Sequence, residues 1–214
     1  MNISNADIVI DIGCGDGTLL KLASEFIKRG FGILPTDEEV DRVRSEMNGH
    51  YTNIDIIKGS ARSTPLPSGL GTKIVCNGVI LLLPKSEVEQ ALREIVRISY
   101  PGATVYIGEI PSRNEFENRS YGDSLSKWLF WVACHRGIKA FSKNLLQVCR
   151  SILTKEPFII APKTHFYSHP TAFERMAENC GLIHQDSFVH KEITANGEEK
   201  EHSNRFDFMF KTAG

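Results

Sequence analysis

The chain has 214 residues, of which 41% are hydrophobic, and a formal net charge of −1. This length fits one domain with room for an insertion, and the balanced charge excludes a whole-protein attraction to nucleic acid or to a membrane surface. The five cysteines form no C-x-x-C pair, which argues against a disulfide framework and a structural zinc site and favours a reducing, cytoplasmic setting. The polar first seven residues are not typical of a signal peptide, and no long apolar run predicts a membrane-spanning helix.

The first structural signal is a strand, a glycine turn and a helix in direct succession. Residues 8–12 form an apolar, β-branched run that is typical of a buried parallel strand. Glycines then recur at every second position: Gly13, Gly15 and Gly17. Such a turn lets backbone N–H groups approach a ligand, and the apolar spacing that follows predicts a helix packed on the sheet. A polar ligand is therefore expected at this turn, near the helix N-terminus.

The spacing of these glycines separates two kinds of ligand. A dinucleotide-binding turn prefers G-x-G-x-x-G, whereas this chain has G-x-G-x-G with Asp11 before the first glycine and Asp16 between the last two. Two carboxylates would repel a pyrophosphate, but they suit a ligand with an ammonium or sulfonium group. The stretch from Val9 to Gly17 closely resembles the first motif of class I S-adenosylmethionine-dependent methyltransferases.

This resemblance implies a doubly wound, Rossmann-like α/β fold with a seven-stranded, mostly parallel sheet that ends in an antiparallel hairpin. It also implies S-adenosylmethionine as the cofactor. The residues that it assigns to cofactor binding in the first motif are Asp11, Gly13, Cys14, Gly15 and Gly17.

A second strand is predicted over residues 31–37, after a first helix that ends near Gly30. The strand ends in Asp37, twenty residues beyond Gly17. An acidic side chain there can accept hydrogen bonds from both ribose hydroxyls of an adenosine ligand. The alternative is that Asp37 caps the helix predicted after it.

The loop after the third predicted strand, residues 53–58, resembles the stretch in which the family reads the adenine edge. Ser60 and Ala61 occupy the positions where the family often has Asp and Ala. A serine hydroxyl can still form a hydrogen bond with adenine. The alternative is an ordinary proline-rich loop.

Residues 73–83 resemble the fourth strand of the family and the turn after it. Asn77 and Gly78 are placed to contact the methionine end of the cofactor through their backbone carbonyls, unless Asn77 only ends the strand. The family often has a pair of histidines near positions 81 and 82, where this chain has Leu81 and Leu82. This difference removes a frequent polar group from the mouth of the site.

Strands and helices are expected to alternate from residue 7 to residue 110, which predicts a sheet with helices on both faces and a ligand at the carboxyl ends of its strands. The remaining elements are a helix that begins at Ser86, a strand over residues 103–110, a helix from residue 171 to Cys180, and hairpin strands over residues 183–194 and 205–211. The charged residues 198–202 are expected to form a solvated loop in that hairpin.

Residues 111–168 are too many for a loop in a compact domain and predict a helical cap, inserted between a core of residues 1–110 and a C-terminal part of residues 169–214. The stretch from Ser124 to Lys155 contains no Asp or Glu and interleaves basic with apolar residues. A basic amphipathic cap suits an acidic or amphipathic substrate or a lipid headgroup surface. Alternatively, the cap packs on the sheet and leaves its lysines in water. A homodimer interface is a further interpretation of Trp128, Phe130 and Trp131.

The catalytic candidates are His165, Tyr167 and His169, which lie just before the last long helix. In small-molecule members of the family this segment often closes over the substrate. Histidine titrates near neutral pH, so a general base is expected here rather than a metal pair, and no metal is predicted. Each histidine is alternatively a structural hydrogen-bonding residue. Tyr121 and Glu109 are weaker candidates for the base.

The resemblance implies a methyltransferase that acts on a small molecule, by in-line attack of an O, N or C nucleophile on the sulfonium methyl group. A noncatalytic S-adenosylmethionine-binding protein and an NAD(P)-dependent oxidoreductase remain alternatives. A nucleic-acid methyltransferase is disfavoured because Asn77-Gly78-Val79 is not the Asn-Pro-Pro-aromatic motif of amino-directed DNA enzymes. The family usually has a helix before its first strand, so either that helix is missing here or the insertion covers the cofactor in its place.

Overall fold

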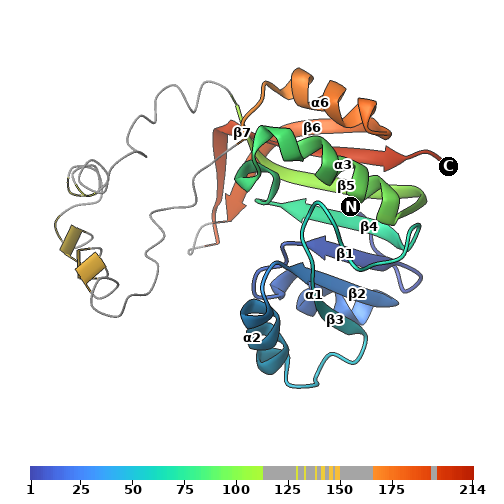
Figure 1. The fold of residues 1–214 in the computed structure, drawn as a ribbon, viewed down its shortest axis with the longest axis horizontal. Helices are drawn as coiled ribbons and strands as arrows, with labels where there is room; N and C mark the ends of the chain where they lie inside the picture. The colour runs from blue at the N-terminus through green and yellow to red at the C-terminus, as the bar shows by residue number, and fades with distance from the viewer. Residues whose placement is uncertain are drawn as a thin grey trace. The chain divides into compact units, whose positions relative to one another are not determined.

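The computed structural model describes residues 1–112, 166–193 and 197–214, together with residues 129, 133, 138, 141, 142, 145, 146, 148 and 149. At positions 192, 193, 202 and 203 only the backbone is described. The chain divides into two units, Met1–Ser112 with His165–Gly214 and Arg113–Thr164. The first unit contains the sheet (Figure 1). Apart from the few positions above, the predicted cap lies outside the described residues.

The first unit is built on a seven-stranded sheet with the order β3-β2-β1-β4-β5-β7-β6 (Figure 1). The strands are β1 (Ile8–Ile12), β2 (Arg29–Leu34), β3 (Ile54–Lys58), β4 (Gly71–Asn77), β5 (Ser99–Pro111), β6 (Leu182–Ile193) and β7 (Glu199–Thr212). The first five run parallel, and β7 lies antiparallel between β5 and β6. The strand order reverses between β1 and β4, and sheets of this kind bind ligands at the carboxyl ends of the strands beside such a reversal. The predicted Rossmann-like fold is confirmed.

Helices cover both faces of the sheet. One face packs on α1 (Thr18–Ala23), the short 3-10 helix η1 (Ser24–Phe26) and α2 (Asp37–Met47), and the other on α3 (Lys85–Ile98) and α6 (Pro170–Asn179). A second 3-10 turn, η2 (Ile80–Leu82), follows β4. No helix in the described part of the chain is long and apolar enough to cross a membrane.

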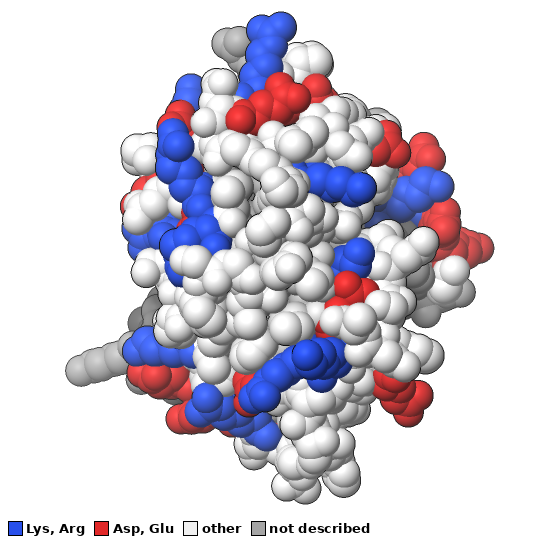
Figure 2. Space-filling model, turned by 90° about the vertical axis from the view of Figure 1, so that its right-hand side faces the viewer, with Lys and Arg blue, Asp and Glu red and all other residues white. Residues whose placement is uncertain are grey.

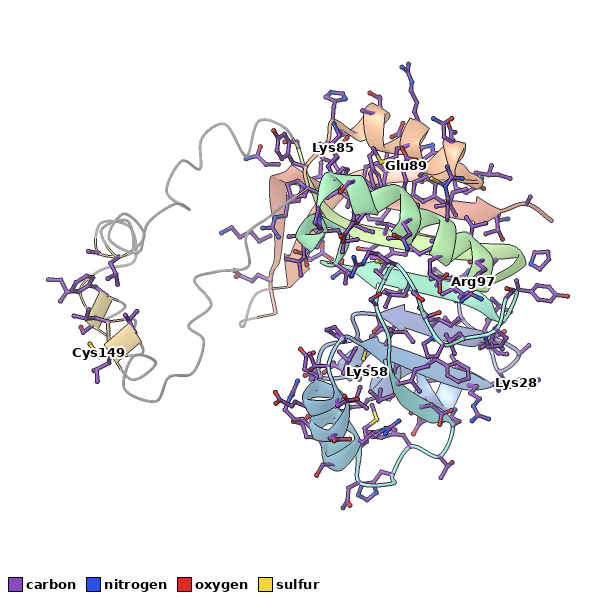
Figure 3. All side chains as sticks on the ribbon, viewed as in Figure 1. Lys28, Lys58, Lys85, Glu89, Arg97 and Cys149 are labelled. Atoms are coloured by element: carbon purple, nitrogen blue, oxygen red, sulfur yellow. The ribbon has the colours of Figure 1, made fainter. Side chains whose placement is uncertain are left out.

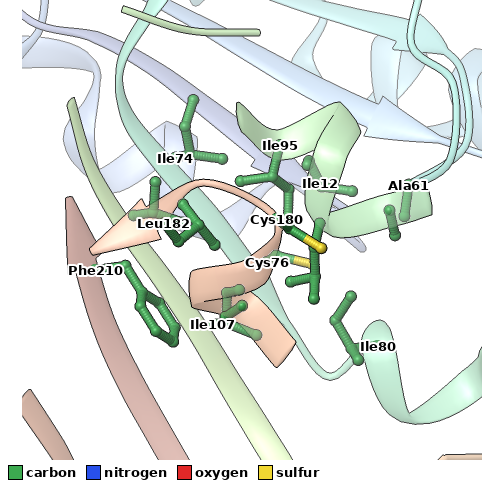
Figure 4. Close-up of a cluster of buried hydrophobic side chains, with 14 of the residues drawn as sticks. Ile12, Ala61, Ile74, Cys76, Ile80, Ile95, Ile107, Cys180, Leu182 and Phe210 are labelled. Atoms are coloured by element: carbon green, nitrogen blue, oxygen red, sulfur yellow. The ribbon is translucent and has the colours of Figure 1, made fainter. Parts of the chain in front are cut away.

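The larger core lies between the sheet and helices α3 and α6 (Figure 4). The buried side of α3 follows the helical period, with Val88, Ala91, Leu92, Ile95 and Ile98 all 0% exposed. Phe173 of α6 packs on Phe208 of β7, with ring centroids 4.9 Å apart. Full burial of each such side chain contributes about 1.5–3 kcal/mol. This core fixes the antiparallel strands to the parallel half of the sheet.

The first helix is shorter than the sequence suggested, and the prediction that it ends near Gly30 is wrong. The helix ends at Ala23 and the 3-10 turn at Phe26, because Asn53 donates hydrogen bonds to the carbonyls of Ser24 and Ile27 at 2.9 and 3.0 Å. Gly30 lies inside β2, where a Cβ atom would stand 3.1 Å from the Leu20 side chain. The glycine therefore serves close packing of helix on strand rather than a helix end.

The expected alternation of strands and helices fails between β3 and β4, where the described chain forms turns instead of a helix. This segment, residues 59–70, is tied to α3. The Glu94 carboxylate accepts hydrogen bonds from the backbone N–H and hydroxyl of Thr64 at 2.6 and 2.8 Å. Arg97 donates to the carbonyl of Leu66 at 2.9 Å (Figure 3). These bonds hold the loop that was predicted after the third strand against α3.

The predicted loop over residues 198–202 is also wrong over most of its length. Residues 199–202 belong to β7 and pair with residues 190–193 of β6. Lys191 forms an ion pair with Glu199 at 3.1 Å and lies 3.9 Å from Glu201. Cross-strand pairs of opposite charge support a strand, so this charged run extends the hairpin into water instead of ending it.

Candidate functional site

The glycine turn between β1 and α1 contains two packing glycines and one that faces open space. All three have left-handed backbone angles, with φ of 74° at Gly13, 58° at Gly15 and 76° at Gly17. A Cβ atom at Gly13 would overlap the Val79 side chain, and one at Gly17 would lie 2.6 Å from Cε of Met47. At Gly15 a Cβ would meet nothing within 4 Å. Gly15 is therefore the position where a ligand can approach the backbone.

Several amides of this turn already have acceptors. The N–H groups of Gly13 and Cys14 both donate to the carbonyl of Ile33, at 2.9 and 3.4 Å. The N–H of Thr18, the first residue of α1, donates to the Asp16 carboxylate at 3.0 Å. These bonds anchor the turn to β2 and cap the helix. Fewer backbone N–H groups of the turn therefore remain open to a ligand than the sequence suggested. The backbone near Gly15 is where a ligand can make contact.

Asp11 is the most unusual titratable group near the turn. Its side chain is 5% exposed at the carboxyl end of β1, and within the described residues no group donates a hydrogen bond to its carboxylate. Burial raises the pKa of Asp11 to about 7. Burial makes this carboxyl costly to ionise, and a cation beside it would offset that cost. The position therefore fits an ammonium or sulfonium group.

Cys14 belongs to the protein core by its side chain. It is buried in the smaller cluster with Leu20 and Ile56, and a Cβ atom at Gly32 would lie 2.6 Å from its sulfur. Burial, with the nearby Asp11 carboxylate, raises the pKa of the Cys14 thiol to about 12. The thiol is therefore protonated and packed, and only the backbone of Cys14 faces the turn's outer side.

Asp37 lies at the carboxyl end of β2 as the first residue of α2. The helix cap is Thr36, whose hydroxyl accepts from the Glu39 N–H at 3.2 Å and donates to the Glu39 carboxylate at 2.8 Å. The alternative that Asp37 caps the helix is therefore wrong. Its carboxylate is 73% exposed and pairs with Nζ of Lys58 at 2.6 Å (Figure 3). Asp37 is thus open to a ligand at the same edge as the glycine turn.

The turn after β3 holds Ser60 and Ala61 in a fixed conformation. Ser60 and Ser63 exchange two backbone hydrogen bonds of 3.0 Å. Ala61 is 5% exposed and packs in the larger core, so its backbone alone remains for a ligand. Hydrogen bonds from Arg97 lower the pKa of Glu94 although burial opposes them, so the anchor of this loop is charged at neutral pH.

At the end of β4, the Asn77 side chain turns toward β5. Its Nδ2 donates to Oε1 of Glu109 at 3.3 Å. Gly78 has φ of 67°, and a Cβ there would lie 3.5 Å from the same Glu109 oxygen. The Gly78 N–H donates to the carbonyl of Gly108 at 3.3 Å. The carboxyl ends of β4 and β5 therefore meet at Glu109.

Glu109 is held in a conformation that side chains rarely adopt. Its φ is 62°, in the middle of a bulge in the β5–β7 pairing. Its N–H donates to Asp207 at 2.8 Å, and its carboxylate accepts from Arg205 at 2.5 Å. The other described non-glycine residue with positive φ is Asn48, which ends α2, a common place for asparagine. In Glu109 the positive φ belongs to the bulge, and both bulges and backbone strain of this kind are common at functional sites.

Asp207 and its neighbours continue this arrangement into β6. Asp207 is 3% exposed and lies 2.9 and 3.0 Å, through its two carboxylate oxygens, from Nδ1 of His190. Burial, with the charge of the nearby Asp207 carboxylate, raises the pKa of the Tyr106 hydroxyl. We call the set Asn77, Tyr106, Glu109, Arg205 and Asp207 the acceptor-side cluster. Of these residues only Asn77 and the weaker candidate Glu109 were predicted from the sequence.

The segment before α6 lies beside this end of the sheet. The N–H of Phe166 donates to the carbonyl of Leu81 at 3.1 Å, and that of Ser168 donates to the carbonyl of Pro111 at 3.0 Å. Tyr167, between them, is 41% exposed. The structure therefore brings Tyr167 near the turn after β4 and the end of β5.

Of the two histidine candidates, the structure describes His169 only. His169 is exposed at the N-cap position of α6, with Nδ1 2.9 Å from the Thr171 hydroxyl. His165 lies outside the described residues, as do Tyr121 and the aromatic residues that the sequence analysis offered as a homodimer interface: Trp128, Phe130 and Trp131.

The surface charge of the described unit agrees with the balanced composition. On the face shown in Figure 2, acidic and basic side chains are interspersed and do not gather into a patch of one sign. That face offers no basic track for a nucleic-acid backbone.

Residues 9–102 match a family model described as a methyltransferase domain. No curated protein matches the chain. The matched residues contain the glycine turn, Asp37, the loop with Ser60 and Ala61, and Asn77, which are four of the regions on which the resemblance rests.

Solved structures similar to this chain cover nearly all of it. A S-adenosylmethionine-dependent methyltransferase from Methanosarcina mazei is 18% identical over 99% of this chain and 94% of that one, with a TM-score of 0.63. A putative methyltransferase from Haloferax volcanii, in complex with the methyltransferase activator Trm112, is 14% identical over 100% and 86%, with a TM-score of 0.67. The [4+2]-cyclase SpnF is 13% identical over 98% and 76%, with a TM-score of 0.62. At these identities the similarity shows a shared fold.

Proposed function

We propose that the chain is a class I, S-adenosylmethionine-dependent methyltransferase that acts on a small molecule, an interpretation supported by the methyltransferase domain that matches residues 9–102 and by the shared fold. The observation that carries the proposal is Asp11, a buried carboxylate without a donor among the described residues, at the end of β1 and beside the glycine turn. An ammonium or sulfonium group would satisfy it, whereas a pyrophosphate would not.

The other cofactor contacts follow from the strand ends. Asp37 is open to accept hydrogen bonds from the ribose hydroxyls, and the loop at Ser60 and Ala61 lies next along this edge for adenine. Asn77 and Gly78 would face the methionine end. Gly15 offers open backbone between them. In this order a nucleoside would lie toward β2 and β3 and an amino acid toward β1 and β4, which would match the two ends of S-adenosylmethionine.

When bound, the cofactor supplies an electrophilic methyl group on a sulfonium centre. The work of the chain is then to hold an acceptor O, N or C atom in line with that methyl group and to exclude water. The acceptor-side cluster would orient the acceptor from the β5 side, and the inserted segment, basic in sequence, would add selectivity for an acidic or amphipathic molecule. His165, Tyr167 and His169 would cover the acceptor from the segment before α6.

The test of the cofactor assignment is calorimetric titration with S-adenosylmethionine and S-adenosylhomocysteine, beside NAD and NADP. We expect micromolar-range binding of the first pair and a loss of about tenfold or more in Asp37→Ala, since hydrogen bonds to a charged group contribute about 1.5–3 kcal/mol. Asp55→Ala is the matched control, because Asp55 forms an equally short 2.6 Å pair with Arg29 at the opposite ends of the same strands. Binding of NAD in place of these ligands would establish the oxidoreductase alternative.

A general base in the segment before α6 is tested by pH–rate profiles of Tyr167→Phe and His169→Gln. A histidine base gives an acidic limb near its pKa, and removal of a base costs about 10²–10⁴-fold in rate. If His169 acts only through Thr171 at the helix end, the limb persists in His169→Gln. In that case the assignment passes to Tyr167 or to His165.

One specific observation favours a noncatalytic, or differently catalytic, alternative. Leu81 and Leu82 stand where the family often has histidines, and the fold neighbour SpnF is a [4+2]-cyclase. A protein of this kind would bind S-adenosylmethionine tightly yet form no S-adenosylhomocysteine with any acceptor of a broad panel of alcohols, amines and activated carbon acids. The same preparation, run by sedimentation velocity, also tests the homodimer prediction.

A further inference from the structure

Strand β5 turns Glu109 out of the apolar core by means of one extra residue. Ile107 and Ile110 are both buried in the larger core, at 0% and 1% exposed. Side chains alternate between the two faces of a strand, so residues three positions apart share a face only where an extra residue is inserted. The β5–β7 pairing contains that residue, because Gly108 and Glu109 together lie opposite the single residue Asp207. Without the bulge, the Glu109 carboxylate would lie on the core side of the sheet.

The Asp207 side chain takes the place of the backbone partner that the bulge removes. Its carboxylate accepts a hydrogen bond from the Glu109 N–H at 2.8 Å. Nδ1 of His190, on β6, donates to the same carboxylate and lies 2.9 and 3.0 Å from its two oxygens. The Tyr106 hydroxyl is hydrogen-bonded to it as well. Donors from two strands therefore hold this carboxylate, which is 3% exposed, in one orientation.

The Glu109 carboxylate keeps room for a further hydrogen bond. Among the described residues, its Oε1 accepts from Asn77 at 3.3 Å and its Oε2 accepts from Arg205 at 2.5 Å. An ionised carboxylate has about four lone-pair sites, and 25% of this side chain is exposed. A ligand at the ends of β4 and β5 therefore meets oxygen atoms that only accept hydrogen bonds. A nucleophile with an N–H or O–H group fits such a position, and a carbon acid does not.

We propose that Glu109 receives the N–H or O–H group of the methyl acceptor, and that Asp207, oriented by His190, is the positioning residue that holds Glu109 there. The inference rests on the proposed methyltransferase function and narrows its substrate class to amines and hydroxyl compounds. In the reaction, a lone pair of the acceptor N or O atom forms the bond to the methyl carbon. The bond between methyl and sulfur breaks with its electron pair going to sulfur, and the acceptor proton passes to solvent.

The positioning role is tested by amide hydrogen exchange at Glu109, measured by NMR on the full chain without ligand. Asp207→Ala removes the acceptor of the Glu109 N–H, and exchange there should become about tenfold faster or more. Asp207→Asn keeps one oxygen and should restore part of the protection. Asp186→Ala is the matched control, because Asp186 also accepts a backbone N–H, that of Ser187 at 2.9 Å, beside a bulge in the β6–β7 pairing. It should leave exchange at Glu109 unchanged.

Two variants of His190 decide the same question if Asp207→Ala does not fold. His190→Leu removes the donor that orients Asp207, whereas His190→Gln keeps an N–H donor at this position. Exchange at Glu109 should therefore be faster in His190→Leu than in His190→Gln. Equal exchange in these two variants, or unchanged exchange in every folded variant, would overturn the positioning role.

The acceptor class is tested with three probes that share one carbon skeleton: sec-butylamine, 2-butanol and butanone. Each is titrated into the full chain saturated with S-adenosylhomocysteine, and the NMR signals of the Glu109 amide and the Asn77 side chain are followed. The amine, the alcohol or both should shift these signals, whereas butanone has no N–H or O–H group and should not. In Asp207→Asn the probes that bind should do so about tenfold more weakly, while the affinity for S-adenosylhomocysteine stays that of the parent chain.

A shift from butanone as large as that from the other two probes, or no shift from any probe, would overturn the proposed acceptor class. An equal loss of S-adenosylhomocysteine affinity in Asp207→Asn would overturn the specific role of Asp207. These outcomes are separate from a failure of the proposed function. If S-adenosylhomocysteine does not bind the parent chain, the methyltransferase assignment fails, while the exchange measurement, made without ligand, still tests how Asp207 holds Glu109.

Discussion

The two halves of the carboxyl edge of the sheet are assembled in different ways. The cofactor half is built mainly from residues 11–61, at or next to the ends of β1, β2 and β3, with the backbone of Asn77 and Gly78 beside it. The acceptor half joins β4, β5 and β7, and the partners Glu109 and Arg205 lie 96 residues apart in sequence. The residues of the first half lie near strand ends that can be recognised in the sequence, whereas those of the second half come together only when distant strands pair. The following predictions test whether this division is also a division of function.

The largest effect is expected from Asp11→Asn in the cofactor half. The pKa of Asp11 in the folded chain is raised to about 7 from 3.8. A raised pKa contributes stability that is present below about pH 4 and is lost as pH rises through 7. Three pH units correspond to at most about 4 kcal/mol. We therefore expect the variant to be more stable than the parent at pH 8 by several kcal/mol, and equal to it near pH 4.

Urea unfolding at several pH values measures this difference, and calorimetry on the same samples measures S-adenosylhomocysteine affinity. Affinity should fall in Asp11→Asn, since the ammonium of the ligand loses its carboxylate. A variant that gains stability and keeps full affinity would separate Asp11 from the cofactor. A flat stability profile in the parent chain would show that its carboxylate is satisfied in solution.

The next largest effect separates two glycines of one motif. Gly13→Ala must place a Cβ onto Val79 with φ of 74°, and we expect a loss of about 2–5 kcal/mol, from left-handed backbone strain and overpacking together. Gly15→Ala meets no neighbour and carries only the strain, about 1–2 kcal/mol.

Unfolding curves and ligand titrations should then rank the two variants in opposite order. Gly13→Ala should lose more stability, while Gly15→Ala, where the backbone faces open space, should lose more affinity per kcal/mol of stability. Equal losses of stability and affinity in the two variants would mean that the glycines act as one structural turn. The separate roles assigned to Gly13 and Gly15 would then be wrong.

This contrast also explains how far the sequence could lead. The first motif, Asp37 and the strand positions follow from hydrophobic runs and neighbouring turn residues, so they could be predicted. The loop between β3 and β4 could be predicted from its prolines, but its attachment to Glu94 of α3, thirty residues away in sequence, could not. The register of β5 against β7, which creates the bulge at Glu109, has no local signal, and so Asp207 and Arg205 were missed.

The smallest of these effects is expected in the acceptor half. Glu109→Gln removes one charge of the pair with Arg205, whose two side chains are 25% and 24% exposed. A hydrogen bond to a charged, largely buried group is worth about 1.5–3 kcal/mol, so we expect a loss of about 1–2 kcal/mol. Glu199→Gln, in the exposed 3.1 Å pair with Lys191, is the matched control and should change stability by less than about 0.5 kcal/mol.

The functional readout of Glu109→Gln decides the division itself. S-adenosylhomocysteine affinity should stay within about twofold of the parent, because Glu109 contacts Asn77 only through its side chain, whereas the cofactor would use the backbone at Asn77 and Gly78. Turnover of an acceptor should fall, and the loss should show as a raised KM for the acceptor or a lowered kcat, not as weaker cofactor binding. Asp11→Asn should show the reverse pattern. If Glu109→Gln weakens the cofactor as much as Asp11→Asn does, the two halves of the edge form a single site, and the acceptor must be sought elsewhere on the molecule.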